Sequence, residues 1–355
     1  MTVTIFNARR ELKMSNSESK PSNITADGQV LYLDAASLEN KVDRSRPLRK
    51  NKSDGLGVKN WLVHRISLML AQEKNEIMHE KAFQSILKMA ATPEDSIANK
   101  LLNKVMGTDE NGYSHVHVLP LNVELTDRHS TVIVPYDLMV AEIKDADCIA
   151  IMNYCICRKA LHCKDYPQDF GCIFTGIAAQ HVLDMGIAHK ATVAEAIAHV
   201  DKAAELGLMG AADFIEGEQF VWDLKNSEMN DCRMLCFCCE CCCVAMNSLK
   251  NSTRDINSHF SPVGWTAVVD QNKCVGCRAC AKRCPRKCIS FNESGKRVTD
   301  NTACLGCGFC KKACKFNAIS IKQTMPMRQN LNEYYLHEAR IDDGRQHAPA
   351  VPCQH

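Results

Sequence analysis

The C-terminal part of the sequence repeats a cysteine pattern that is typical of iron–sulfur ligation. The first copy, C-x2-C-x2-C-x3-C-P, begins at Cys274, and the second copy begins 30 residues later at Cys304. Two-residue gaps let one tight loop direct three thiolates at three irons of a cluster, while the fourth cysteine ligates the other cluster. The sequence therefore predicts two [4Fe-4S] clusters with crossed ligands. Cluster 1 takes Cys274, Cys277, Cys280 and Cys314, and cluster 2 takes Cys304, Cys307, Cys310 and Cys284.

The unit around these cysteines is an internal repeat. Other residues recur at the same 30-residue offset, such as Asp270 with Asp300 and Ile289 with Ile319. On these motifs, residues 264–322 resemble a bacterial-type dicluster ferredoxin. The resemblance implies a small two-fold α+β fold, with a hairpin strand before and after each cluster loop.

Two positions depart from the ferredoxin pattern. Lys315 stands where a proline would follow the last cysteine, and Cys288 is an additional thiol that matches Ala318 in the second repeat. We expect Cys288 to be a spare thiol. Zinc is the main alternative metal, but a zinc finger pairs two C-x2-C units across a loop. The cysteine triplets followed by a fourth cysteine favour iron–sulfur clusters instead.

Two upstream blocks contain eleven more cysteines that are candidate metal ligands. The second block is the denser one, with six cysteines in the eight positions from Cys236 to Cys243. Structural cysteines rarely crowd in this way, and a reducing compartment would not hold them as disulfides. We therefore expect the two blocks to bind additional metal, of iron–sulfur type. The candidate ligands are Cys155, Cys157, Cys163, Cys172, Cys232, Cys236, Cys238, Cys239, Cys241, Cys242 and Cys243.

The elements that must position these blocks can be predicted from the apolar pattern. Strands are expected at 115–119, 131–134 and 148–152, with a helix that begins at Pro135 and runs to residue 146. This βαβ-like order would deliver the first cysteine block to the carboxyl end of a strand, where ligands gather in open α/β sheets. If the second block were helical, one face would carry Cys232, Cys236, Cys239 and Cys243.

Three further helices are expected, and capping residues indicate two of them. One helix is expected around residues 82–89, and the next is expected to start with Thr92 as its N-cap and to stop at Gly107. The third follows the capping box formed by Thr192 and Glu195 and stops at Gly207. We expect this last helix to pack the first cysteine block against the second.

Composition sets the domain plan and the compartment. The 355 residues include 22 cysteines and carry a net charge of +2, and the sequence has no apolar run of signal-peptide or membrane-span length. A cysteine-rich chain of this kind points to metal or redox thiols in the cytoplasm. The fold class is predicted as α+β, with four segments. They are a flexible leader (1–58, with a short strand at 29–33), a mixed α/β Cys-rich domain (59–252), the dicluster ferredoxin domain (264–322) and a tail (323–355).

The layout from about residue 60 onward also resembles uncharacterised dicluster 4Fe-4S proteins of anaerobic bacteria and archaea, on the runs NYCICR and CFCCECCC. The resemblance implies a redox role and no particular substrate. We expect an electron-transfer protein that relays single electrons through two [4Fe-4S] clusters to or from a partner oxidoreductase. Two alternatives stay open. One is a redox-sensing regulator that binds DNA through residues 82–106, and the other is a reductase that uses the upstream cysteines.

Charge gives one expectation about the partner. Residues 266–322 contain twelve Lys and Arg against three Asp and Glu. These basic side chains either compensate the anionic clusters or form a docking face for an acidic patch of the redox partner. Nucleic acid is not the expected partner, because residues 59–104 carry only seven basic residues against five acidic ones. Membrane insertion is not expected either.

Overall fold

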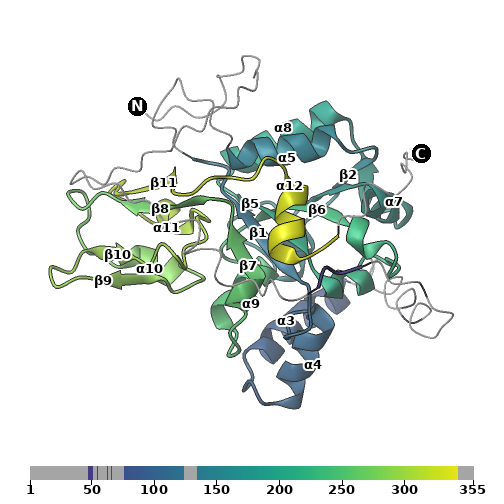
Figure 1. The fold of residues 1–355 in the computed structure, drawn as a ribbon, viewed down its shortest axis with the longest axis horizontal. Helices are drawn as coiled ribbons and strands as arrows, with labels where there is room; N and C mark the ends of the chain where they lie inside the picture. The colour runs from purple at the N-terminus through teal and green to yellow at the C-terminus, as the bar shows by residue number, and fades with distance from the viewer. Residues whose placement is uncertain are drawn as a thin grey trace.

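A computed structural model describes residues 47–50, 76–123 and 134–342, together with Asp54, Leu62 and Arg65; of residues 76–79 it describes only the backbone. The predicted strand at 29–33 and most of the strand at 131–134 lie outside the described residues. The chain forms a mixed α/β body around one large sheet and a smaller C-terminal unit beside it (Figure 1). The mixed α and β architecture expected from the sequence is therefore confirmed.

The large sheet has seven strands in the order β4-β2-β3-β6-β5-β1-β7. Its strands are β1 His115–Leu119, β2 Ile149–Met152, β3 Ile173–Thr175, β4 Ala188–Lys190, β5 Met209–Phe214, β6 Arg233–Cys238 and β7 Phe260–Pro262. All five residues of β1 and all four of β2 are buried, which explains their continuous apolar runs. Neighbouring strands are antiparallel except for the parallel pair β1 and β7.

Of the βαβ-like unit predicted before the first cysteine block, the helix (α5, Pro135–Lys144) and the second strand (β2) are present, and most of the first strand lies outside the described residues. β2 lies between β3 and β4 and is antiparallel to both. The cysteine-bearing chain between β2 and β3 is a return loop, so it needs no helical crossover of the kind that parallel strands require. It contains only one short helix, α6 Ile156–Ala160.

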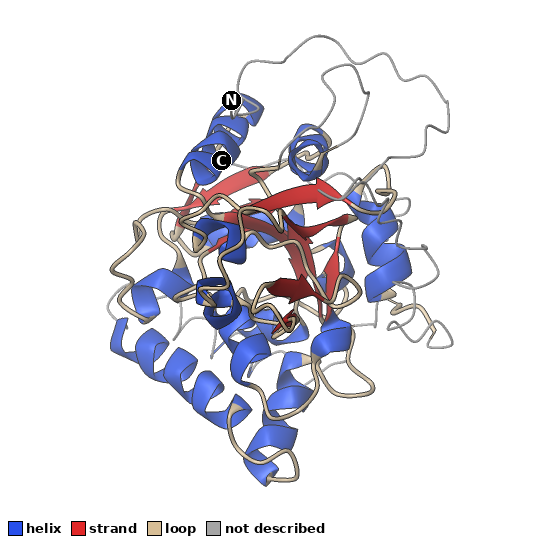
Figure 2. Ribbon diagram, turned by 90° about the vertical axis from the view of Figure 1, so that its left-hand side faces the viewer, coloured by secondary structure: helices blue, strands red, loops and turns tan. Residues whose placement is uncertain are grey.

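Helices lie on both sides of the strands (Figure 2). On one side α5 packs against α8, and on the other α3 packs against α4, α6 and α9. The longer helices are α3 Glu76–Ala90, α4 Ile97–Met106, α5 Pro135–Lys144, α7 Ile177–Asp184, α8 Val193–Glu205 and α9 Val244–Asn251. Short helical turns are η4 Glu216–Phe220, η5 Met229–Asp231 and η6 Asn257–His259. No helix among the described residues is long and apolar enough to span a membrane.

The predicted helix starts are confirmed for two helices and wrong for one. Pro135 opens α5, and the capping box of Thr192 and Glu195 precedes α8. The helix expected to start after Thr92 instead begins at Ile97, because the Ser96 side chain accepts the N–H of residue 99. Gly107 ends that helix in the left-handed conformation, as predicted.

The C-terminal unit repeats one motif twice. Its elements are β8 Trp265–Val269, α10 Ala279–Arg283, β9 Ile289–Phe291, β10 Arg297–Thr299, α11 Phe309–Lys312 and β11 Ile319–Gln323. Antiparallel pairing joins β8 to β11 and β9 to β10. Each repeat therefore contributes a strand, a cluster loop with a short helix, and a second strand. The two repeats exchange strands across the pseudo-two-fold axis.

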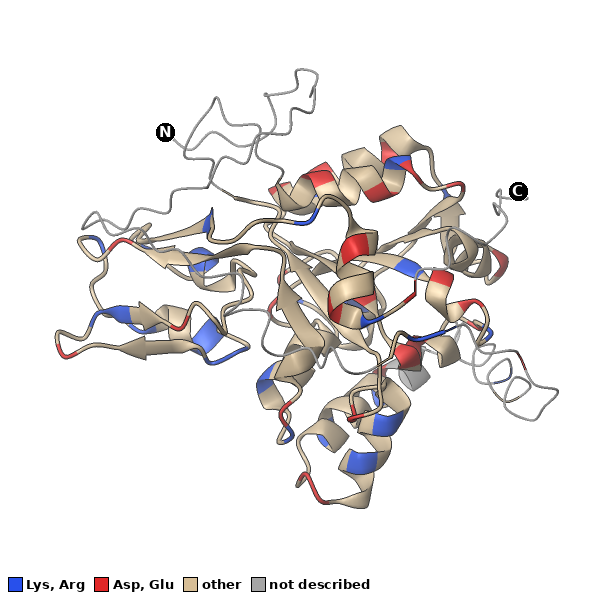
Figure 3. Cartoon of the chain, viewed as in Figure 1, with Lys and Arg blue, Asp and Glu red and all other residues tan. Residues whose placement is uncertain are grey.

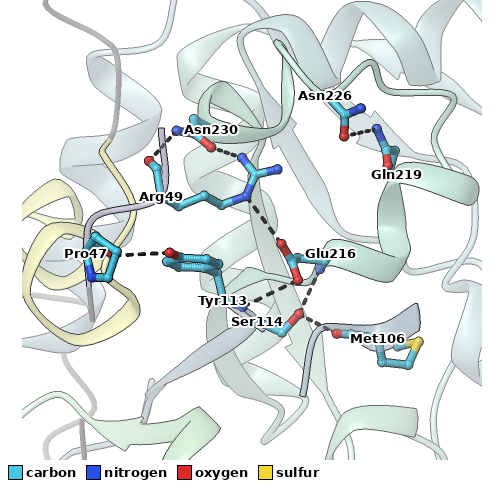
Figure 4. Close-up of polar contacts among 9 residues, drawn as sticks. All are labelled: Pro47, Arg49, Met106, Tyr113, Ser114, Glu216, Gln219, Asn226 and Asn230. Atoms are coloured by element: carbon cyan, nitrogen blue, oxygen red, sulfur yellow. Dashed lines mark hydrogen bonds and ion pairs between the residues drawn. The ribbon is translucent and has the colours of Figure 1, made fainter. Parts of the chain in front are cut away.

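Parts of the predicted leader and tail pack on the large sheet. Figure 4 shows Arg49 held between Glu216 and Asn230, with a distance of 3.3 Å from Arg49 Nε to Glu216 Oε1. Arg49 also forms a parallel bridge with Ile341. The segment before Ile341 contains α12 Leu331–Tyr334 and the π-helical turn η7 Tyr335–Ala339, in which Tyr335 is fully buried. Residues near both ends of the described chain thus belong to the core that supports the cysteine blocks.

Candidate iron–sulfur and thiolate metal sites

Two cysteine-lined cavities lie in the C-terminal unit. The empty volume is about 350 Å³ at cavity 1 and about 330 Å³ at cavity 2, and both figures include solvent at the cavity mouths. Each cavity is lined by three cysteines of one loop and by the fourth cysteine of the other repeat. Cavity 1 has Cys274, Cys277, Cys280 and Cys314, and cavity 2 has Cys284, Cys304, Cys307 and Cys310. The structure thus brings together the two crossed sets expected from the spacing.

The repeat symmetry extends to backbone hydrogen bonds that reach the sulfurs. The N–H of Ala267 donates to Cys304 Sγ at 3.4 Å, and the N–H of Arg297, 30 residues later, donates to Cys274 Sγ at 3.5 Å. Each bond crosses from one repeat to the loop of the other. Such bonds stabilise negative charge on sulfur, which favours thiolate ligation and raises the potential of an attached cluster.

A glycine in each loop lets the backbones of the two repeats approach closely. Gly306 has φ +68°, and a Cβ there would lie 2.0 Å from the carbonyl oxygen of Trp265. Gly276 has φ +70°, and its Cβ would lie 2.4 Å from the carbonyl oxygen of Gly295. Both positions exclude a side chain on steric and conformational grounds.

Gly306→Ala is expected to lower the melting temperature and the iron content of cavity 2, because the new methyl group collides with Trp265. Gly308→Ala is the matched control, since Gly308 also has a positive φ of +82° but open space around its Cβ position. The control should cost about 1–2 kcal/mol from backbone strain alone. Thermal unfolding and iron analysis of both variants make the comparison, and equal losses would contradict the steric argument.

Cys288 lies inside cavity 2 and is not remote from the cluster ligands. Its Sγ atom is 3.5 Å from Cys284 Sγ. Hydrogen bonds from the Cys288 thiol lower the pKa of Cys284 to about 6 and that of Cys304 to about 7. Cavity 2 therefore has five thiols, whereas the position that matches Cys288 in the other repeat is Ala318.

Arg297 is a buried cation between the two cavities. Its side chain is 1% exposed and lines both of them. Nε donates to Thr299 Oγ1, while the two terminal nitrogens have no oxygen or nitrogen acceptor among the described residues. Burial opposes the charge, but the thiolates of Cys310, Cys280 and Cys304 outweigh it, so the pKa of Arg297 is raised. A buried guanidinium that is stabilised by the cysteine ligands of both cavities fits two anionic clusters on either side of it.

A family model described as a 4Fe-4S binding domain matches residues 267–290 and, a second time, residues 297–320. The C-terminal unit binds two [4Fe-4S] clusters. No curated protein and no solved structure matches the chain. The two matched repeats include all the cysteines that line the two cavities.

Four upstream cysteines, here called the tetrathiolate group, form a compact set. They come from the loop after α6 and from the turn after β6, and their Sγ atoms all lie within 4.8 Å of one another. The Sγ atoms of Cys163 and Cys241 are 3.6 Å apart. The members are Cys163, Cys239, Cys241 and Cys242.

Six other upstream cysteines form a second set, here called the six-thiol group. The Sγ–Sγ distance is 3.1 Å between Cys172 and Cys236 and 3.2 Å between Cys243 and Cys238. Hydrogen bonds also join Cys155 to Cys157 and Cys236 to Cys238. The members are Cys155, Cys157, Cys172, Cys236, Cys238 and Cys243.

Cys232 is the one upstream candidate outside both groups. It is 2% exposed, and burial together with the nearby Glu218 carboxylate raises its pKa. The second block is not helical, since it forms strand β6 followed by a tight turn, so Cys232 does not share a helical face with the three later cysteines. Twenty described cysteines are free thiols, whereas the buried Cys148 is disulfide-bonded, which the expectation of reduced cysteines did not include.

Proposed function

We propose that the protein is an electron-transfer protein that relays single electrons through its two C-terminal [4Fe-4S] clusters to or from a partner oxidoreductase in the cytoplasm. The observation that carries the proposal is the pair of crossed, cysteine-lined cavities separated by a buried arginine. We assign Cys274, Cys277, Cys280 and Cys314 to cluster 1 and Cys304, Cys307, Cys310 and Cys284 to cluster 2.

The sites of the two clusters differ in their exposure to solvent, so an external partner can approach one cluster more closely than the other. Cavity 1 is lined by Cys277, which is exposed, and by Val275 and Phe316, which are 59% and 47% exposed. Around cavity 2, Cys304 and Leu305 are 6% and 2% exposed. We propose that the external partner exchanges electrons with cluster 1 and that cluster 2 serves the interior of the protein.

The test is electron uptake by the anaerobically prepared full chain. We expect reversible uptake of about two electrons by the C-terminal unit, one per cluster, with two EPR signals that titrate separately. Cys277→Ser should abolish rapid reduction by an external donor more severely than Cys307→Ser, because Cys277 lies at the exposed site. A chain that holds both clusters but cannot be reduced and reoxidised would contradict the proposal.

We propose that only some of the twelve basic residues form a docking face (Figure 3). Arg297 is buried, and Arg286 is bound to the carbonyls of Ala303 and Asn257. Lys312 is bound within the chain as well, with Nζ 4.2 Å from the ring centroid of Tyr166. Lys282 and Lys315, which are exposed, are better placed to meet a partner near cluster 1.

Lys282→Glu with Lys315→Glu is expected to slow reduction of ferricyanide, an anion, and to accelerate that of hexaammineruthenium(III), a cation. Both effects should be several-fold at low salt and should vanish near 1 M salt, where the screening length is about 3 Å. The matched control changes Lys100 and Lys104 of α4, which are exposed on another part of the molecule. Equal effects of both double variants would indicate net charge and not a docking face.

The DNA-binding alternative loses its main support in the structure. On α4, Asn99 and Asn103 are buried and donate to backbone carbonyls. The exposed part of α4 carries the apolar Ile97, Leu101 and Val105 beside Lys100 and Lys104. Two lysines next to three apolar side chains are a thin basic stripe for a DNA-binding helix. A reductase reaction at the upstream cysteines stays a hypothesis.

A further inference from the structure

We propose that the upstream cysteines form two chemically different metal centres: the tetrathiolate group binds one tetrahedral ion, zinc or iron, and the six-thiol group binds a third iron–sulfur cluster adjacent to cluster 2. The inference extends the proposed electron relay and assigns ten of the eleven upstream cysteines to two separate sites.

The tetrathiolate group has the dimensions of a single-ion site. A metal–sulfur bond of about 2.3 Å in a tetrahedral site places the ligand sulfurs about 3.8 Å apart. The four Sγ atoms all lie within 4.8 Å of one another, and the Cys163–Cys241 distance of 3.6 Å is close to the tetrahedral value. The Cys242 N–H already donates to Cys239 Sγ at 3.4 Å, which orients a ligand sulfur.

The six-thiol group contains more donors than one ion can bind. It draws its sulfurs from four places around β6: the start of α6, the entry to β3, β6 itself, and the N-terminus of α9. On β6, Cys236 and Cys238 are two residues apart and so project from the same face of the sheet. Thiolates from several segments that surround one space suit a multi-iron cluster, because each iron takes its own thiolate.

Arg158 supplies an independent argument for negative charge at the six-thiol group. Its side chain is 1% exposed, and its nitrogens donate to the carbonyls of Pro167, at 2.9 Å, and Phe237, at 2.8 Å, and to that of Phe170. Carbonyls anchor the guanidinium but do not neutralise it. Arg158 directly follows Cys157 in α6, and the carbonyl of Phe237 that it binds lies between Cys236 and Cys238 in β6. Its buried positive charge therefore lies beside the six-thiol group and fits an anionic centre there.

The six-thiol group lies next to cluster 2 in the packing of the molecule. Cys238 and Cys243 belong to the same buried apolar cluster as Leu305 and Phe309, and Cys236 and Cys307 pack against it. Cys307 is an assigned ligand of cluster 2, and Leu305 and Phe309 are its neighbours in the same loop. Contacts between the two units, such as that of Lys312 with Tyr166, hold the sites in a fixed relation. An electron on cluster 2 thus reaches the six-thiol group through packed side chains and not through solvent.

The test measures metal and acid-labile sulfide in the anaerobically prepared full chain and in three variants. Cys163→Ser with Cys241→Ser should remove about one metal ion per chain and no sulfide. Cys155→Ser with Cys238→Ser should remove about four irons and four sulfides. Cys232→Ser is the matched control, because this cysteine is equally buried but outside both groups, and it should remove neither. The metal that the wild type contains and the first variant lacks identifies the bound ion as zinc or iron.

A second readout tests whether the third cluster is adjacent to cluster 2. The reduced wild type should show EPR broadening from spin coupling beyond the coupling between clusters 1 and 2, and this additional broadening should disappear in the six-thiol variant but persist in the tetrathiolate variant. Cys172→Ser, which removes a single thiol, repeats the measurement if the double variant fails to fold. Folding is judged by retention of the eight irons of clusters 1 and 2.

The outcomes separate this proposal from the proposed function. A wild type with about eight irons and no other metal, unchanged in all upstream variants, would overturn the two upstream centres and leave the two-cluster relay intact. Loss of iron and sulfide from the tetrathiolate variant, with none lost from the six-thiol variant, would overturn the assignment of the two groups. Fewer than eight irons in a folded wild type would instead count against the proposed relay itself.

Discussion

Cys314→Ser is expected to lose about four irons and the signals of cluster 1, whereas Cys284→Ser is expected to keep most of cluster 2. The two cysteines are equivalent in the repeat, since each is the fourth, crossing ligand. They differ in their surroundings. Cys288 lies in cavity 2, 3.5 Å from Cys284, and can take its place as a ligand. The residue that matches Cys288 near cavity 1 is Ala318, which has no donor atom.

Combining Cys284→Ser with Cys288→Ser should then remove cluster 2 and leave cluster 1. Cys288→Ser alone should leave both clusters, because Cys284 is still present. Iron analysis and EPR of the Cys314→Ser, Cys284→Ser, Cys288→Ser and double variants test these expectations. Loss of cluster 1 in the double variant would refute the crossed ligand assignment, and loss of cluster 2 in Cys284→Ser alone would show that Cys288 cannot substitute.

Arg297→Leu is expected to lower the reduction potentials of both C-terminal clusters. Reduction adds a negative charge to a cluster, and the buried guanidinium stabilises that charge. At a separation of about 7 Å and an effective dielectric constant of about 20, a unit charge contributes about 2 kcal/mol. This corresponds to roughly 100 mV for a one-electron couple. The shift should be larger for cluster 2, because Cys310 is the thiolate that stabilises Arg297 most.

Arg297→Lys is the matched control, since it keeps the positive charge but loses the planar guanidinium. Its potentials should lie between those of the wild type and of Arg297→Leu. Redox titration followed by EPR measures both clusters in each protein. Unchanged potentials in Arg297→Leu, with both clusters present, would mean that water screens the charge and that the side chain has a packing role only.

Some features of the protein follow from local sequence and could be predicted from it. The cluster loops are of this kind, because the cysteine spacing within one loop fixes which three thiolates can face one cluster. The crossing fourth cysteine follows from the 30-residue repeat, and the cavities contain the same sets. The capping box before α8 and the glycine that ends α4 depend on neighbouring backbone groups, so they too were predictable. The start of α4 was missed by four residues, because Thr92 and Ser96 are both competent caps.

Other features depend on contacts that sequence spacing does not encode. Arg297 was counted from the sequence among the basic residues of a surface, yet it is buried between two cavities, because β10 pairs with β9 and carries it inward. The density of the second cysteine block indicated metal binding but not how its thiols divide. Their division follows from strand β6, which directs alternate residues to opposite faces, and from the turn after it.

The composition of the six-thiol group was settled by strand register. β3 pairs with β6 so that Ile173 lies opposite Leu235, and this places Cys172 next to Cys236, 64 residues away in the sequence. A register shift of one residue would turn Cys236 to the other face of the sheet. The sequence by itself determined that this protein ligates iron–sulfur clusters and which loops do so. Only the tertiary structure decided which upstream thiols share a site, because antiparallel pairing between distant segments sets their distances.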